Sequence, residues 1–289
     1  MVVLVTGANG QLGQSIQFIA NKYPNIQFVY TDFQEMDITN IENCQAVFAK
    51  HQPHFCINTA AYTAVDKAES ESDKAHLINA VGPENLAKVC KEFDTILVHI
   101  STDFIFDGTS KVPYLETDIP NPKSIYGQTK LDGELAIQKN WEKHFIVRTS
   151  WVYSQFGANF MKTMLRLASE RDTLSVVNDQ IGTPTYAVDL AEVLIKIINT
   201  ENPTPNTQRP FGVYNFSNEG VCSWYDFAAA IFHQKGIQID LKPIPTDSYP
   251  TPAKRPAYSV LDKTKIKKVF GVEIKNWKES LTISLNHLN

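Results

Sequence analysis

The chain has 289 residues, a hydrophobic fraction of 43%, a charged fraction of 20% and a formal net charge of -4. This composition is typical of a globular protein of one or two domains, and it argues against binding to nucleic acid or to an anionic membrane. No apolar run is long enough to cross a membrane, and the first strand-like run begins at Met1 and leaves no room for a signal peptide. We therefore expect a cytoplasmic protein, whose 4 scattered cysteines stay reduced and whose 7 histidines predict no metal site.

An apolar, β-branched run over residues 1–6 opens the chain and breaks into Gly7-Ala-Asn-Gly10-Gln-Leu-Gly13. A strand followed by a glycine-spaced turn and a helix is typical of a dinucleotide site, because the amides at the helix start face the pyrophosphate. Gly7 permits the tight turn, Gly10 lets phosphate approach the backbone, and Gly13 lets the helix lie against the strand. The G-x-x-G-x-x-G spacing is one residue wider than the common fingerprint.

A helical pattern at residues 12–23 and a second apolar run at 26–30 come next, and Asp32 follows that run. This acid lies about twenty residues beyond the glycines, where an acceptor for a ribose hydroxyl is expected. A turn that binds nothing and an ordinary carboxylate at a strand end are the alternatives. The strand, turn, helix and acid taken together favour a dinucleotide site.

Strand-like runs at 55–58, 95–101 and 145–149 alternate with helical patterns at 41–50, 74–91 and 124–139. This alternation predicts an α/β fold, namely a doubly wound parallel Rossmann sheet with helices on both faces. Ligands bind such sheets beyond the carboxyl ends of the strands. Gly7, Asp32, Asn58 and Thr102 all lie at strand ends, so we expect them to meet on one rim.

Beyond residue 150 the pattern changes. A helix near 159–171, a strand at 174–177, a helix at 188–199, a strand at 211–216 and a helix at 224–235 are predicted, with an exposed loop at 202–210 and a proline-rich loop at 243–256. We interpret residues 1–150 with about 186–218 as a dinucleotide-binding domain. About 151–185 with 219–289 would form a smaller α/β domain that binds the substrate over the rim.

Tyr126 and Lys130 are spaced so that they share one face of a helix. Tyr-x-x-x-Lys alone has weak specificity, and a solvated surface pair is the alternative. A ketone that accepts hydride becomes an alkoxide that needs a proton, and a free tyrosine, with a pKa of about 10, is a poor relay at neutral pH. A nearby ammonium lowers that pKa, so Lys130, helped by the positive nicotinamide of an oxidised cofactor, is expected to lower the pKa of Tyr126.

Strand-end Ser101-Thr102, Tyr126 and Lys130 together resemble the Ser/Thr–Tyr–Lys constellation of the extended short-chain dehydrogenases/reductases. Among these enzymes, the dTDP-4-dehydrorhamnose reductase family has an S-T-D-Y-V-F-D-G block, which Ser-Thr-Asp-Phe-Ile-Phe-Asp-Gly at 101–108 resembles. Five further blocks, at 64–69, 148–153, 159–165, 177–182 and 249–256, resemble that family in the same order. The resemblance covers nearly the whole chain and implies reduction of the 4-keto group of a dTDP-linked deoxysugar to give dTDP-L-rhamnose.

Site residues follow from the resemblance by position. Thr102, Tyr126 and Lys130 would be catalytic, with Tyr126 as proton donor and Thr102 positioning the keto oxygen. The cofactor would be NADPH or NADH, and the substrate a dTDP-linked 4-keto-6-deoxysugar. Cofactor-binding residues would be Gly7, Gly10, Gln11, Leu12, Gly13, Asp32, Asp37, Ile38, Asn58, Ala61, Tyr62 and Thr63, together with Tyr126 and Lys130. Substrate-binding residues would be Thr102, Asp103, Phe104, Tyr126, Trp151, Asn159 and Arg255.

Several alternatives stay open. Arg255 is equally suited to a salt bridge that pins its loop, and Trp151 to the core. Phe104 replaces the family's common tyrosine, which puts fine substrate selection in doubt. It also argues against a sugar 4,6-dehydratase, which needs a second carboxylate there. A reductase of a different deoxysugar and a non-catalytic subunit, like the regulatory subunit of methionine adenosyltransferase, are the other candidates.

Cofactor choice and assembly are the last predictions. Asp32 would repel a ribose 2′-phosphate and residues 30–40 contain no arginine or lysine, which favours NADH, although the family often uses NADPH or both. We expect substantial activity with NADH. Metal-linked dimers occur in some members, so a homodimer is one option, but no acidic cluster can be assigned to such a metal.

Overall fold

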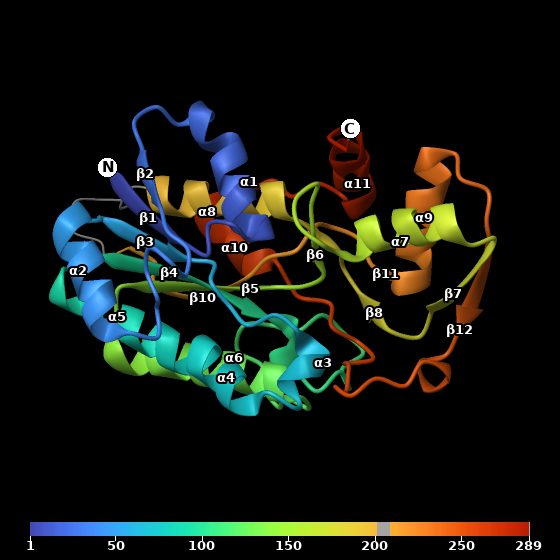
Figure 1. Cartoon of the computed structure of the whole chain (residues 1–289), viewed down its shortest axis with the longest axis horizontal. Helices are drawn as coiled ribbons and strands as arrows, with labels where there is room; N and C mark the ends of the chain where they lie inside the picture. The colour runs from blue at the N-terminus through green and yellow to red at the C-terminus, as the bar shows by residue number, and fades with distance from the viewer. Residues whose placement is uncertain (201–208, 289) are drawn as a thin grey trace.

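A six-stranded parallel sheet forms the centre of the computed structural model, which describes residues 1–200 and 209–288 (Figure 1). The strands are apolar and buried on both faces, as in β3 and β5. The predicted doubly wound parallel sheet is confirmed. In spatial order the strands are β10 (Gly212–Asn215), β5 (His144–Thr149), β4 (Ile96–Thr102), β3 (Phe55–Asn58), β1 (Val2–Thr6) and β2 (Gln27–Tyr30).

Helices cover both faces of this sheet (Figure 1). On one face α1 (Gln11–Ile19) packs against α8 (Ala187–Asn199), and on the other lie α2 (Ile41–His51), α5 (Gly82–Glu92) and α6 (Ile125–Asn140). The strand order reverses between β1 and β3, and an open parallel sheet binds ligands at such a switch point. The turn after β1 and the loop after β3 therefore mark the expected site.

One expected helix, at 74–91, is instead three consecutive pieces. These are α4 (Ser72–His76), a five-residue π-helical turn η2 (Leu77–Val81) and α5. Asn79 in the π turn is fully buried, and its side chain accepts the Tyr62 amide hydrogen at 2.8 Å and donates to the Thr129 hydroxyl at 3.2 Å. The π turn thus ties the loop after β3 to α6. Such turns often occur at functional sites.

A smaller group of elements lies at the right of Figure 1. Strand β7 (Thr173–Val177) pairs in parallel with β12 (Asp240–Ile244), a strand that the sequence analysis missed because Pro243 interrupts it. Proline is tolerated there because β12 pairs on one side only. The other elements of this group are α7 (Phe160–Glu170), α9 (Trp224–Lys235), and the paired short strands β6 (Val152–Tyr153) with β9 (Thr185–Tyr186) and β8 (Ile181–Gly182) with β11 (Cys222–Ser223).

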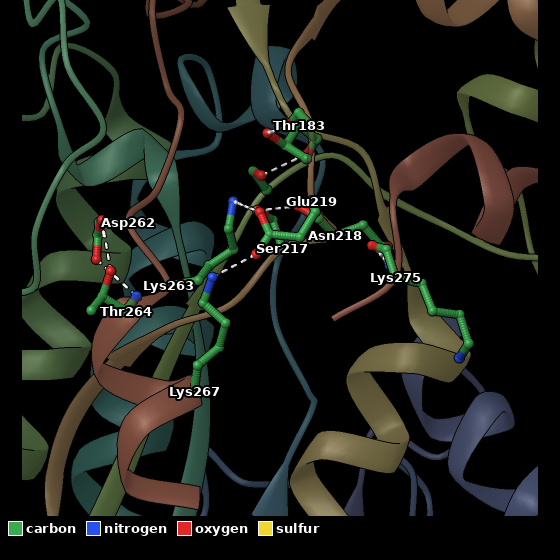
Figure 2. Close-up of polar contacts among 11 residues, drawn as sticks. Thr183, Ser217, Asn218, Glu219, Asp262, Lys263, Thr264, Lys267 and Lys275 are labelled. Carbon is green, nitrogen blue, oxygen red and sulfur yellow. Dashed lines mark hydrogen bonds and ion pairs between the residues drawn. The ribbon is translucent and has the colours of Figure 1, made fainter. Parts of the chain in front are cut away.

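Polar contacts anchor the segment that leaves β10 for this smaller group (Figure 2). The Glu219 carboxylate is paired with Lys267 Nζ at 2.8 Å and with Lys263 Nζ at 3.6 Å. Thr183 donates a hydrogen bond to the Gly220 carbonyl at 2.8 Å. The remaining elements are α3 (Val65–Ala68), α10 (Thr264–Phe270), α11 (Trp277–Asn286) and the single 3-10 turns η1 (Ala20–Lys22), η3 (Asp103–Ile105) and η4 (Thr246–Ser248).

The two-domain division stays a prediction. The fact that supports it is that α8 and β10 return to the large sheet, where β10 pairs with β5. The loop expected at 202–210 lies outside the described residues except for its last two. No helix among residues 1–200 and 209–288 has the length and apolar character needed to span a membrane.

Candidate active site

A cavity of about 980 Å³ lies at the carboxyl ends of β1, β3 and β4. One side, here called the glycine wall, is built by the turn after β1 and the segments after β2 and β3. A second part of the lining, here called the tryptophan wall, consists of Trp151, Asn159, Trp224 and Arg255. The predicted residues that line the cavity are Gly7, Gly10, Gln11, Leu12, Asp32, Asp37, Ile38, Ala61, Thr63, Thr102, Asp103, Phe104, Tyr126, Lys130, Trp151, Asn159 and Arg255.

Three residues predicted to bind the cofactor do not line this cavity. Gly13 lies behind the turn, where an added Cβ would stand 2.5 Å from Ala8 Cα. Asn58 is buried within a side-chain network under the sheet end. Tyr62 is buried as well, and its hydroxyl donates to Glu71 at 2.9 Å. Because a side chain at Gly13 would collide with Ala8, this glycine allows the close packing of helix on strand.

The glycine wall presents backbone to the cavity. Gly7 adopts a left-handed conformation with φ of 62° and lies so close to the β3 loop that a Cβ would stand 2.7 Å from Ala60 N. Gly10 caps α1 without any side-chain hydrogen bond, and a Cβ there would meet only the Gly7 carbonyl, at 3.2 Å. A phosphate can therefore approach the first amides of α1, as a dinucleotide requires.

Asp32 holds the edge of the glycine wall. Its carboxylate accepts the backbone N–H groups of Asn9 at 2.9 Å and Phe33 at 2.8 Å. Each oxygen keeps a free lone pair, so the carboxylate can still accept a hydroxyl. Phe33 also lines the cavity with 72% of its surface exposed, and the sequence analysis did not single it out. Its place directly after Asp32 is the signal that could have found it.

The candidate catalytic residues come from β4 and α6. Ser124 begins α6 by accepting the Gly127 amide hydrogen at 3.1 Å, and Lys130 follows Tyr126 by one turn. Thr102 ends β4 and donates to Asp103 Oδ1 at 3.1 Å. Lys130 is buried, and its Nζ donates to the Ile100 carbonyl at 2.6 Å. Burial lowers the pKa of Lys130 to about 8, against the opposing effect of Glu134.

Burial dominates the pKa of Tyr126 in the protein without cofactor, and the predicted lowering by Lys130 together with a nicotinamide stays a prediction. Burial raises the pKa of the Tyr126 phenol to about 12, while a hydrogen bond with Thr102 lowers it and the charge of Asp103 raises it. The Lys130 ammonium donates to the Ile100 carbonyl. Tyr126 is therefore a protonated phenol at neutral pH, which is the form that a proton donor needs.

Asp103 is the second unusual acid in the cavity. It is almost completely buried, and its Oδ2 has no hydrogen-bond partner. Burial raises the pKa of this carboxyl to about 6. Hydrogen bonds with the Ser259 and Thr102 hydroxyls oppose that rise in pKa, and Oδ2 is itself too buried for a ligand to reach.

The tryptophan wall is built around a strained residue. Trp151 has a positive φ of 48°, which is rare for a bulky side chain. Its ring stacks on Trp224 with centroids 3.6 Å apart, and Gly182 leaves the space, since a Cβ there would stand 2.7 Å from the ring. Trp224 was not predicted, and no sequence spacing could have found it because only the fold brings α9 to β6.

Asn159 and Arg255 join the two walls. Asn159 begins α7 by accepting the Lys162 amide hydrogen, and its Nδ2 donates to Gln11 Oε1 at 3.0 Å. Arg255 forms a bidentate ion pair with Asp66 at 2.8 and 3.0 Å. Arg255 thus forms the salt bridge that was the alternative to substrate binding, and this bridge pins the proline-rich loop. Arg255 also lines the cavity.

Comparisons with known proteins agree with this geometry. The family model described as RmlD substrate binding domain matches residues 1–289. A dTDP-4-dehydrorhamnose reductase from Aggregatibacter actinomycetemcomitans is 42% identical, with 96% of each chain covered. The crystal structure of such a reductase from Clostridium acetobutylicum has a TM-score of 0.93 and 44% identity, over 100% of this chain and 99% of that one. That from Bacillus anthracis, in complex with NADP, has a TM-score of 0.92 and 39% identity, over 99% and 98%.

Proposed function

The chain belongs to the family of the RmlD substrate binding domain, and from that membership we propose that it reduces dTDP-4-dehydro-L-rhamnose to dTDP-L-rhamnose with NADPH or NADH. The observation that carries the proposal is that Thr102, Tyr126 and Lys130 line the same cavity as the glycine wall. A bound nicotinamide supplies hydride to C4 of the sugar. The protein's task is to hold the keto sugar and to deliver the proton.

Each catalytic residue has one task in this proposal. The Tyr126 phenol donates its proton to the oxygen on C4, because its raised pKa keeps it protonated until an alkoxide develops beside it. The Thr102 hydroxyl would turn from Asp103 Oδ1 to donate a hydrogen bond to the same oxygen, and so fix its position. Lys130, held by the Ile100 carbonyl, supplies the positive charge that stabilises the phenolate after transfer.

The two walls divide the binding. The glycine wall would take the dinucleotide, with Asp32 on a ribose hydroxyl and Asp37 and Ile38 beside it. The tryptophan wall would take the sugar nucleotide, with Trp151 and Asp103 against the sugar. Arg255 would then have to share its guanidinium between Asp66 and the ligand. The two-domain division and a homodimer belong to the same proposal.

The test is consumption of NADH and of NADPH with dTDP-4-dehydrorhamnose, generated in situ by the preceding enzymes, followed by identification of the product. We expect dTDP-L-rhamnose and substantial turnover with NADH, because no cation among residues 30–40 could bind a 2′-phosphate. A preference for NADPH of about a hundredfold in kcat/KM would contradict the cofactor prediction. Cofactor binding without turnover would contradict the proposed reaction.

A further inference from the structure

A buried histidine lies directly beneath the catalytic lysine. His99 of β4 is fully buried, and its Nε2 is 3.3 Å from Lys130 Nζ. Its other ring nitrogen, Nδ1, is 2.9 Å from Asn58 Nδ2. The proposed mechanism gives no task to His99. Burying an imidazole ring in this position costs folding free energy unless both of its nitrogens have hydrogen-bond partners.

The direction of each hydrogen bond can be derived from the backbone. The Ala60 amide can only donate, and it points at Asn58 Oδ1 at 3.2 Å. Asn58 must therefore turn its oxygen to Ala60 and Thr6, whose hydroxyl lies 2.6 Å from it, and its NH₂ group to the histidine. Reversing the amide would place its NH₂ group against the Ala60 N–H, which would keep only the longer contact with Thr6 Oγ1 at 3.4 Å.

The same reasoning fixes the histidine. Since Asn58 donates to it, Nδ1 of His99 must be an acceptor and carries no proton. Burial, with the nearby charge of Lys130, holds the pKa of His99 well below its usual range, so the ring is neutral. Its proton is then on Nε2, which points at Lys130 Nζ.

We propose that His99 is a positioning residue that sets the proton affinity of Lys130 by directing an N–H donor at its nitrogen. A neutral amine can accept that hydrogen with its lone pair while donating to the Ile100 carbonyl at 2.6 Å, whereas an ammonium has no lone pair to offer. His99 thereby destabilises the ammonium. Lys130 therefore holds its proton less tightly than a lysine without this neighbour would, while its ammonium form still supplies the charge that stabilises the Tyr126 phenolate.

Few other charges act on this pair. On α6, Glu134 favours the ammonium, but it is committed to a bidentate ion pair with Arg148 of β5. His144 of β5 lowers the pKa of His99, and burial lowers the pKa of His144 in turn. Among the described residues, the polar groups in hydrogen-bond contact with Lys130 Nζ are thus His99 Nε2 and the Ile100 carbonyl.

The first experiment is long-range ¹H–¹⁵N NMR of the imidazole rings in the ligand-free protein, with the His99 signal assigned from its loss in His99→Gln. We expect a neutral ring protonated on Nε2 throughout pH 6 to 9. A ring protonated on Nδ1, or an imidazolium, would overturn the proposal. This result does not depend on the proposed reaction, so the two can fail separately.

The second experiment, which rests on the proposed function, compares the alkaline limb of the pH–kcat profile. His99→Gln places an amide where Nε2 lies, and its oxygen can accept from the ammonium. We assign the loss of kcat at high pH to deprotonation of Lys130. In His99→Gln we expect the apparent pKa of this loss to rise by about one unit, which is a tenfold gain in the proton affinity of Lys130. His144→Gln is the matched control, since His144 contacts the Trp141 carbonyl and leaves the limb in place. An unmoved limb in an active, folded His99→Gln would overturn the proposal.

Discussion

The two walls of the cavity are built in opposite ways. The glycine wall is formed mainly by backbone at strand ends close together in sequence, and an added Cβ at Gly7 or Gly13 would meet main-chain atoms. The tryptophan wall is formed by side chains from distant segments, with Trp151 held in a strained conformation by stacking on Trp224. A wall made of backbone can serve one common cofactor, whereas side chains can be changed to select a substrate.

The largest expected effect concerns Tyr126, which stands between the walls. Tyr126→Phe keeps the edge contact with Phe104, whose ring centroid is 5.5 Å away, and removes only the hydroxyl. We expect kcat to fall by about 10² to 10⁴, with the cofactor Kd unchanged, because proton donation is lost and both walls are intact. Steady-state kinetics and a cofactor titration measure this. A variant as active as the wild type would remove Tyr126 from the mechanism.

The next effect separates Gly10, which lines the cavity, from Gly13, which lies behind the turn. Gly13→Ala puts a Cβ 2.5 Å from Ala8 Cα, so the helix must shift, and we expect a loss of about 1 to 3 kcal/mol in unfolding free energy. Gly10→Ala is the matched control, because its Cβ meets only one carbonyl at 3.2 Å. We expect Gly10→Ala to keep the wild-type Tm and to lose cofactor affinity. Equal Tm losses in the two variants would contradict this division.

A smaller effect tests the tryptophan wall. Trp224→Leu removes the stack on Trp151, and we expect KM for the sugar nucleotide to rise about tenfold with the cofactor Kd unchanged. Tyr225→Leu, on the same helix but outside the cavity lining, is the control and should leave KM near its normal value. A change in cofactor Kd that matches the change in KM would show that the walls do not act separately.

The smallest effect concerns the ion pair that joins the walls. The Arg255 guanidinium holds the pKa of Asp66 below its usual range, so the pair stabilises the fold above the carboxyl's unfolded pKa of about 4 and loses that contribution as pH falls through the folded pKa. Both side chains are partly exposed, so about 1 kcal/mol at most is expected. Between pH 7 and 3, Tm should fall less in Asp66→Asn than in the wild type. Identical slopes would exclude a contribution from the pair.

The contrast between the walls also explains what the sequence could predict. The turn after β1, Asp32 and the Tyr126–Lys130 pair are local patterns, and the structure brings all of them to one cavity. The π turn at Asn79 and strand β12 were missed, since the first depends on contacts with Tyr62 and Thr129 and the second contains Pro243. The contact of His99 with Lys130 and the Trp151–Trp224 stack need the fold, because no spacing reports them.

The fate of the hydride tests the proposed reaction of this protein without relying on any variant. The protein would be incubated with cofactor deuterated at the transferable position of the nicotinamide and with dTDP-4-dehydrorhamnose, and the product examined by NMR. We predict one deuterium, at C4 of the deoxysugar, in a product identified as dTDP-L-rhamnose. Product without deuterium at C4, or consumption of cofactor without a new sugar nucleotide, would contradict the account.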